Sequence, residues 1–383
     1  MWSMSTPVFN LLDRYLLAAA LRPLASALAV SLLILLMERL LRLVRLVASG
    51  GGSFDLVMWM ALNLVPHYLG LAMPAALFFA VHVVMTRLDA DSELDAIRGA
   101  GVALSRACRA FFLLALLLAG LALAVVGWLQ PLGRYEYRAM VHAISQRVWN
   151  GELPAATLVQ AADGLLISAE KVEAGGRRLE GVFIRQSSKD GAQSVTTARA
   201  GRMLLSADQT HMSIQLEDGE KLRLTRGGAT QVLAFTGLTD MVTVRVTPEP
   251  FRPRGAEVRE LTLPELADIL AGRIPSDIPP RLLTAEFHAR LVRAASLPFV
   301  PMLAAGLGIG AKRAPRGMGL VAGGLVLFLY HHALLTGESL AESGHAQPVP
   351  ALWGAFALFA VFNLLLYLVL DRHPVPGLAW RRR

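Results

Sequence analysis

Residues 23–37 read PLASALAVSLLILLM and form the core of an apolar stretch that extends over about residues 15–47. A helix needs roughly 20 apolar residues to cross a bilayer, so this stretch is long enough to cross one and to project beyond it. It is too long for a signal peptide, and it ends among the charged residues Glu38, Arg39, Arg42 and Arg45. The sequence therefore predicts a transmembrane helix as the first element.

Five further apolar stretches of similar length follow the first one. They cover about residues 56–85, 104–129, 284–311, 317–335 and 351–370. Of the 383 residues, 54% are hydrophobic and only 17% are charged, a composition that is typical of membrane proteins rather than of soluble domains. We therefore expect six transmembrane helices in two groups of three.

The texture of the sequence changes between about residues 131 and 280, where short segments alternate between apolar and polar residues. Met212, Ile214 and Leu216 alternate with polar neighbours, and Asp218-Gly219 then predicts a tight hairpin turn. Further strands are expected near residues 165–169, 181–185, 195–198, 231–235 and 242–246. The predicted fold class is thus membrane α-helical, with an inserted all-β domain of sandwich or jelly-roll type. Near the end of this region, Thr262 and Glu265 have the spacing of a capping box, which predicts a short linker helix.

The charges of the loops predict the orientation of the helices. The loop at about residues 336–350 has two glutamates and no lysine or arginine, whereas the loop 312–316 and the tail 381–383 are basic. Because positive loops favour the cytoplasm, we place the latter two there, and an even number of spans places the N-terminus there as well. The β domain then lies outside, in the periplasm of a diderm bacterium. Its stability cannot depend on an intrachain disulfide, because Cys108 is the single cysteine.

Three arginines recur at three-residue spacing on one side of the first helix: Arg39, Arg42 and Arg45. In the predicted topology they lie at the outer end of this helix, against the positive-inside tendency. They either snorkel to outer headgroups, with Glu38 paired to Arg42 at i,i+4, or form a cationic rim for the phosphates of a lipid. Two arginines near the outer end of the fourth helix would extend this arginine rim: Arg290 and Arg293.

Other motifs favour packing over chemistry. Gly319 and Gly323 form a G-x-x-x-G in the fifth helix, which is typical of close helix packing and also suits a helix that moves against a partner. The histidines and glutamates between His331 and His345 match no zinc signature, and no Ser, His and acid combination indicates nucleophilic catalysis. We therefore expect neither a metal nor a cofactor in this chain.

The polar segment 86–103 between the second and third helices predicts a short amphipathic helix. Ser92 has the residue type of an N-cap, Leu94 and Ile97 share one face, and the glycines at 99 and 101 can end the helix. Such an acidic segment is either a solvated loop or a docking helix for a soluble partner. No G-x-x-x-x-G-K-[ST] occurs in the sequence, so any ATP hydrolysis would have to come from a partner subunit.

The order of these parts resembles the lipopolysaccharide export permease family LptF/LptG over nearly the whole chain. The likeness is carried by residues 12–16 (LDRYL), by residues 74–78 (PAALF), and by residues 85–101, which contain Ser92-Glu93-Leu94 and Gly99-Ala100-Gly101. The linker 260–280 is closer to LptG and residues 349–353 are closer to LptF, with the balance leaning slightly to LptF.

This resemblance implies an ABC permease in which two related six-helix subunits, each with an extracytoplasmic jelly roll, enclose a cavity and sit on two cytoplasmic ATPase subunits. It implies that Glu93 pairs with a basic group of the ATPase and that the first and fifth helices line lateral gates. The outer arginines of the first helix would contact substrate phosphates. The jelly roll would stack on similar domains of single-span and periplasmic bridge proteins and pass the lipid outward.

The sequence thus predicts three segments: residues 1–130 with the first three helices and the coupling segment 86–103, residues 131–280 with the β domain and linker helix, and residues 281–383 with the last three helices. The predicted function is that of a permease subunit that extracts lipopolysaccharide from the inner membrane, driven by a partner ATPase. The alternative is a mechanotransmission subunit that couples ATP hydrolysis to a periplasmic partner without moving lipid. A membrane enzyme would need acid, base or metal groups clustered at one depth, and none stands out.

Overall fold

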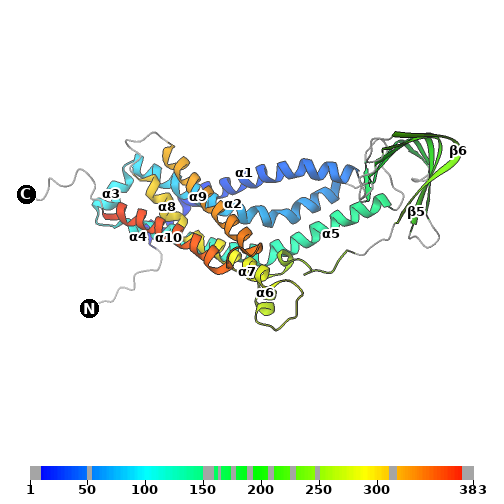
Figure 1. Ribbon diagram of the computed structural model, residues 1–383. Coiled ribbons are helices and arrows are strands. Elements are labelled where there is room, and N and C mark those ends of the chain that lie inside the picture. The colour runs from blue at the N-terminus through cyan, green and yellow to red at the C-terminus, as the bar shows by residue number, and fades with distance from the viewer. Residues whose placement is uncertain are drawn as a thin grey trace, which may run out of the picture. The chain divides into compact units, whose positions relative to one another are not determined.

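The structure, a computed structural model, describes residues 10–49, 54–149, 159–162, 165–173, 178–187, 193–205, 211–224, 230–245, 251–309 and 317–372 (Figure 1). The predicted basic loop 312–316 and basic tail 381–383 lie outside these residues. The chain folds as two compact units. We call the described parts of residues 1–37, 63–135 and 254–383 the bundle unit, and those of residues 38–62 and 136–253 the sheet unit.

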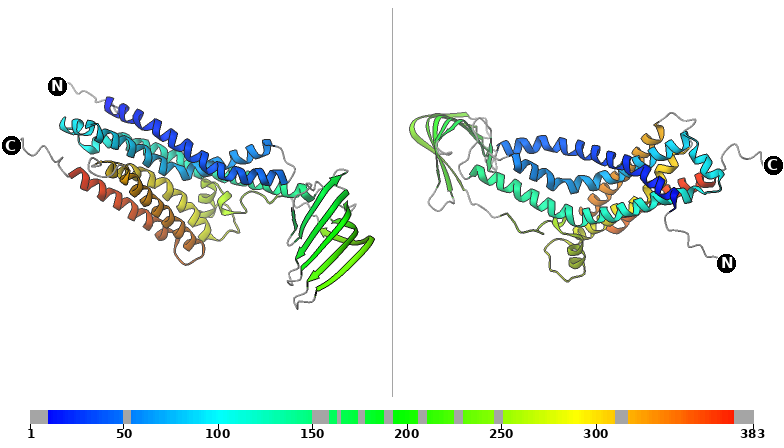
Figure 2. Two further views of the ribbon diagram at one scale, coloured as in Figure 1. Left: turned by 90° about the horizontal axis from the view of Figure 1, so that it is seen from above. Right: turned by 180° about the vertical axis from the view of Figure 1, so that it is seen from behind.

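Six helical segments of the described chain are long and apolar enough to cross a membrane, as predicted. They are α1 (Leu11–Ser49), α2 (Phe54–Ala90), α4 with η1 and α5 (Leu104–Ala124, Val125–Leu129 and Gln130–Trp149), α7 with η3 and α8 (Pro280–Ser296, Leu297–Phe299 and Val300–Gly308), α9 (Met318–Glu342) and α10 (Pro348–Arg372). The short helix α3 (Glu93–Gly99) joins α2 to α4. Figure 2 shows the first three spans in blue to turquoise and the last three in yellow to red.

The bundle unit is held together by one large apolar cluster. Its buried residues come from α1, α2, α3, α4, η1, η3, α8 and α10, and Leu77, Met85 and Phe111 are almost completely enclosed. Helix α1 contributes mainly its first turns, through Leu16 and Ala20. We call the end of the bundle where α3 lies the α3 end, and the end where the linker helix α6 (Leu263–Leu270) meets α7 the α6 end.

Two boundaries differ from the prediction. The third span does not stop near residue 129, because α5 continues as a helix to Trp149, so the predicted β domain begins with 19 helical residues at 131–149. Pro131 lies two residues after the end of the π-helical turn η1, a wider turn that is often found where a helix accommodates an irregularity. The predicted acidic loop 336–350 is also largely helical, since α9 extends to Glu342 and α10 begins at Pro348.

The β domain of the sheet unit is one antiparallel sheet whose described strands pair in sequence order. The strands are β1 (Val159–Ala162), β2 (Leu165–Glu173), β3 (Arg178–Ser187), β4 (Gln193–Leu205), β5 (His211–Leu224) and β6 (Thr230–Arg245). The inserted β domain is therefore confirmed, and its described strands run up and down rather than in the crossed order of a two-sheet jelly roll. Ile167, Ile184 and Ile214 belong to its apolar cluster.

The predicted hairpin turn at Asp218-Gly219 is wrong. Both residues lie inside the continuous strand β5, where the pairing with β6 shifts between Leu216 and Gly219. Asp218 has a positive φ of 52°, so the chain makes a β-bulge here instead of a turn. Gly219 suits this place because a Cβ atom on it would overlap the carbonyl oxygen of Thr197 on the neighbouring strand.

The linker that leads from the sheet to α7 begins with η2 (Val258–Glu260) and α6. The predicted capping box is confirmed. The Glu265 carboxylate accepts hydrogen bonds from the backbone N–H of Thr262 at 2.7 Å and from the Thr262 hydroxyl at 2.8 Å. Leu261, Leu266 and Leu283 form a small core that packs the linker onto α7. The linker is thus a fixed part of the bundle unit.

Candidate functional site

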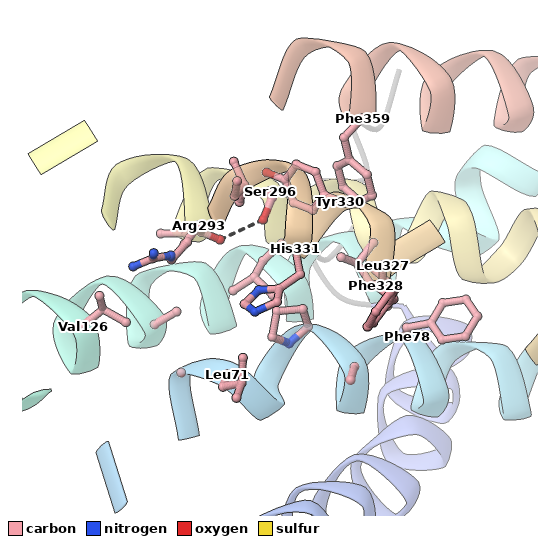
Figure 3. A pocket seen from close by; sticks show the side chains of 18 of the residues that line it. Leu71, Phe78, Val126, Arg293, Ser296, Leu327, Phe328, Tyr330, His331 and Phe359 are labelled. Atoms are coloured by element: carbon pink, nitrogen blue, oxygen red, sulfur yellow. Dashed lines mark hydrogen bonds between the residues drawn. The ribbon is translucent and has the colours of Figure 1, made fainter. Parts of the chain in front are cut away.

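The bundle unit contains a cavity of about 740 Å³ between α2, α4, η1, α5, α7, η3, α8, α9 and α10. Its wall is mostly apolar, with Leu71 and Phe78 from α2 and Leu327 and Phe328 from α9 (Figure 3). Volumes of about 300–1,000 Å³ are usual for pockets that bind small molecules. The cavity is therefore large enough for an apolar ligand or part of one.

Polar residues also line this cavity. They include His67 and Gln130, whose Nδ1 and Nε2 atoms lie 3.1 Å apart, together with Arg293, Ser296, Tyr330 and His331. In Figure 3 the ring of Phe78 lies toward one end and the guanidinium group of Arg293 toward the other. This arrangement suits an amphipathic ligand with an anionic group at the α6 end.

Arg293 is held in place by an ion pair across two helices. Its guanidinium group on α7 contacts the carboxylate of Glu338 on α9, which is 7% exposed. Glu338 also lies 3.7 Å from Arg259 of the linker, which contacts Glu342 at 3.1 Å. Burial lowers the pKa of Arg259, but the carboxylates of Glu342, Glu338 and Glu286 raise it by more, so this cation is firmly charged. The network joins the linker, α7 and α9.

The structure corrects the expectation for Arg290. Its side chain is only 2% exposed and makes two hydrogen bonds within the chain. Its Nε donates to Glu286 Oε1 at 2.8 Å, and its Nη1 donates to the carbonyl oxygen of Leu261 at 2.7 Å. Arg290 therefore holds the linker against α7, and its burial removes it from an exposed arginine rim. Arg293 is 32% exposed and lines the cavity.

Three of the residues between 331 and 345 that could ligate a metal contact other side chains instead. Glu338 and Glu342 pair with arginines, and His345 Nδ1 lies 2.9 Å from Ser343 Oγ. Within the described ranges, no group of three His, Cys, Asp or Glu side chains has the arrangement of metal ligands.

The arginine rim of α1 belongs to the sheet unit. The predicted pair is confirmed, since Arg42 Nη2 contacts Glu38 Oε1 at 3.1 Å, and the Arg42 side chain remains 60% exposed. Arg39 instead donates to the Tyr137 hydroxyl at 3.2 Å, with its guanidinium carbon 5.8 Å from the centre of that ring. Arg45 lies on α1, but its side chain lies outside what the structure describes. Arg42 is thus an accessible cation, whereas Arg39 is half-buried.

At the α3 end, the predicted short helix is confirmed. Leu94 is buried, and Gly101 ends the helix with a positive φ of 86° while Val102 N–H bonds to the Ile97 carbonyl oxygen. Ser92 occupies the N-cap position, but its φ of 59° is left-handed and its side chain makes no capping hydrogen bond. The predicted capping role of the Ser92 side chain is therefore wrong.

Glu93 is hydrogen bonded within the chain, which the sequence did not predict. The Tyr15 hydroxyl donates a hydrogen bond to Glu93 Oε2 at 2.8 Å and accepts one from Arg87 Nη2 at 3.0 Å. Nearby, Asp13 is completely buried and accepts two hydrogen bonds from Arg106, at 2.8 and 3.1 Å. The only sign of these contacts in the sequence is that charged residues, Asp13 and Arg14, lie at the start of an apolar helix. This pattern does not indicate which residues they contact.

Gly323 lies where α9 meets α2, and Gly319 lies where α9 meets α8 and α2. A Cβ atom on Gly323 would overlap the ring of Phe78, and one on Gly319 would overlap the carbonyl oxygen of Leu307 and approach the ring of His82. The two glycines thus serve close packing, as expected for G-x-x-x-G. Their contact lies next to the cavity, which Phe78 also lines.

A family model described as lipopolysaccharide export system permease LptF/LptG matches residues 14–369, and it does not separate the two types. A comparison with curated proteins gave no match.

Proposed function

The chain belongs to the lipopolysaccharide export permease family LptF/LptG, and from this premise we propose that it extracts lipopolysaccharide from the bacterial inner membrane as one permease subunit of an ATP-driven exporter. The family is one of transport permeases rather than of catalytic enzymes. The observation that carries the proposal is the extent of the match, which runs from the first turns of α1 to the last turns of α10 and includes the sheet.

The proposed orientation places the α3 end, both termini and the loop between α8 and α9 in the cytoplasm, with the sheet in the periplasm. It is supported by the basic residues of the loop 312–316 and the tail 381–383. On this orientation, α3 is on the side of the membrane where ATP is available, and the arginine rim lies on the periplasmic side.

Two features support lipid handling by this chain. The mostly apolar cavity with Arg293 at one end matches the chemistry of an acyl chain next to a phosphate. Arg42 is an exposed arginine near the end of α1 in the sheet unit, and its guanidinium group can donate two hydrogen bonds to a phosphate. We assign Arg39, Arg42 and Arg45 to phosphate contact, and Gly319 and Gly323 to the packing of a helix that borders the substrate path.

The energy source is assigned to a partner. ATP binds to a cytoplasmic ATPase dimer, and this chain needs no cofactor of its own. Helix α3, with Ser92, Glu93, Leu94 and Ile97, forms the docking element for that dimer, and Glu93 pairs with a basic group on it. A second, paralogous permease subunit completes the membrane part, and the sheet stacks on the β domains of a single-span protein and a periplasmic bridge protein.

Substitution of the arginine rim tests the proposal. The variant Arg39→Gln, Arg42→Gln, Arg45→Gln, carrying a photo-crosslinking amino acid at the exposed Leu41, is compared in cells with the same label in the unsubstituted chain. Because a hydrogen bond to a charged group contributes about 1.5–3 kcal/mol, crosslinking to lipopolysaccharide is expected to fall by roughly tenfold or more.

The matched control removes three other exposed arginines, Arg185, Arg202 and Arg273, so that the net charge falls equally. Crosslinking in this control is expected to stay near that of the unsubstituted chain. If the rim variant crosslinks as well as the control, the three arginines only snorkel to headgroups.

A further inference from the structure

Helix α1 packs into the bundle unit mainly through its first turns. Leu16, Ala20 and Leu24 are buried in the main cluster, but further along the helix Leu33 and Ile34 are 67% and 64% exposed. In its most apolar stretch only 6% of the residues are buried, against 56% in α2. The part of this helix that belongs to the bundle unit, up to Met37, is therefore held chiefly at the α3 end.

Two polar contacts secure that end. The first is the buried pair in which Asp13 accepts two hydrogen bonds from Arg106 of α4. The second is the Tyr15 hydroxyl, which donates to Glu93 of α3 and accepts from Arg87 of α2. Through this one oxygen atom, α1 is joined to the last turn of α2 and to the first residue of α3.

The two contacts differ in what they depend on. Asp13 is completely buried, so the Asp13–Arg106 pair belongs to the folded core. Tyr15 is 42% exposed, and its ring does not fill that core. Its hydroxyl is therefore placed to fix the carboxylate of Glu93 without being needed for the stability of the bundle.

We propose that Tyr15 is a positioning residue that orients Glu93 and ties α3 to α1, so that a displacement of α3 by the ATPase moves α1. This inference rests on the proposed function, in which Glu93 receives the ATPase. In the described chain, the Tyr15 hydroxyl donates a hydrogen bond to Oε2 of Glu93. The other carboxylate oxygen of Glu93, Oε1, is then left for a basic group of the partner. A carboxylate held in one orientation loses less side-chain entropy on binding than a freely rotating one.

The experiment uses the complete exporter, purified through a tag on this chain and reconstituted into proteoliposomes that contain lipopolysaccharide. The variant Tyr15→Phe removes the hydroxyl oxygen and keeps the ring. Tyr68→Phe is the matched control, because Tyr68 is a partly buried tyrosine of α2 that contacts His67 and not Glu93. The readouts are ATP hydrolysis, co-purification of the ATPase, and lipopolysaccharide released per ATP.

We expect Tyr15→Phe to retain the ATPase and to release roughly tenfold less lipopolysaccharide per ATP, as for the loss of one hydrogen bond to a charged group. Tyr68→Phe is expected to match the unsubstituted complex. The double variant Tyr15→Phe, Glu93→Gln is expected to release as much as Glu93→Gln alone, because Tyr15 acts through Glu93.

Three other outcomes would contradict either the role of Tyr15 or the coupling role of Glu93. If Glu93→Gln lowers release but Tyr15→Phe does not, the inference fails and the proposed function stands. If the effects of Tyr15→Phe and Glu93→Gln multiply in the double variant, Tyr15 acts independently of Glu93 and the inference also fails. If Glu93→Gln leaves both ATPase association and release unchanged, the coupling role in the proposed function is itself wrong.

Discussion

At the residue scale, a close contact between α2 and α9 depends on the absence of one side chain. Gly323 is buried against the ring of Phe78, whereas the adjacent Gly324 has open space where a Cβ atom would lie. We expect Gly323→Ala to force the ring out of its place and to destabilise the protein by about 1–3 kcal/mol, the usual cost of overpacking. Gly324→Ala is expected to be neutral or slightly stabilising, because alanine favours a helix by about 1 kcal/mol over glycine.

Thermal unfolding of the two purified variants in the same detergent checks this expectation. Gly323→Ala should unfold at a lower temperature than the unsubstituted chain, and Gly324→Ala should not. Equal unfolding temperatures for the two variants would contradict the close packing of α9 on α2.

Single residues also set the limit of what the sequence predicts about the site. The Glu38–Arg42 pair could be predicted because both residues lie on one helix at a fixed spacing. Arg290 could not be distinguished from an exposed arginine, because its partner Leu261 belongs to the linker and the burial comes from tertiary packing. The link between Tyr15 and Glu93 spans 78 positions in the sequence, and no local pattern reveals it.

At the scale of elements, the linker helix α6 depends on a carboxylate. A hydrogen bond from Arg254 is the main cause that lowers the pKa of the Glu265 carboxyl, and hydrogen bonds from Thr262 lower it further. Burial raises this pKa, but the hydrogen bonds outweigh it and bring the pKa from 4.5 to about 2. A carboxylate whose pKa is lower in the folded state stabilises the fold above its unfolded pKa and loses this effect as the pH falls. The stabilisation of α6 should therefore be complete above about pH 5 and be lost between about pH 4.5 and 2.

Hydrogen exchange at the buried Leu266 amide, corrected for the intrinsic exchange rate at each pH, measures this effect. In the unsubstituted chain, protection at Leu266 is expected to decrease as the pH falls through this window. Glu265→Gln keeps a similar shape without a titrating charge and should show lower protection at pH 6 with a flatter pH profile. The same profile in both chains would mean that Glu265 does not hold the helix.

Among the elements, long apolar runs were predicted well because twenty apolar residues in a row have few alternatives to a membrane helix. Helix α5 was missed because its sequence after Pro131 is polar and lacks an apolar run. Asp-Gly is a common signal of a tight hairpin turn, but here Asp218 takes its positive φ at a bulge inside the continuous strand β5. Alternation predicted residues that do lie in strands, but the expected strands near 231–235 and 242–246 are one continuous strand as far as the structure describes them, β6. Alternation also does not determine the order of strands in a sheet.

At the scale of the whole molecule, the order of the parts could be predicted from texture and charge alone, and the family match agrees with it over residues 14–369. The cavity could not be predicted, because its lining residues come from helices that are far apart in the sequence. The family and the architecture of the chain are established, and the passage of lipid through its cavity is the claim to test directly.

That test places a photo-crosslinking amino acid at Leu71, which lines the cavity and is 41% exposed, in the complete exporter in cells. The control position is Leu117 of α4, which is 75% exposed and does not line the cavity. If lipopolysaccharide occupies the cavity during export, Leu71 should crosslink to it strongly and Leu117 only at background level. Equal crosslinking at the two positions, or none at Leu71, would contradict the account.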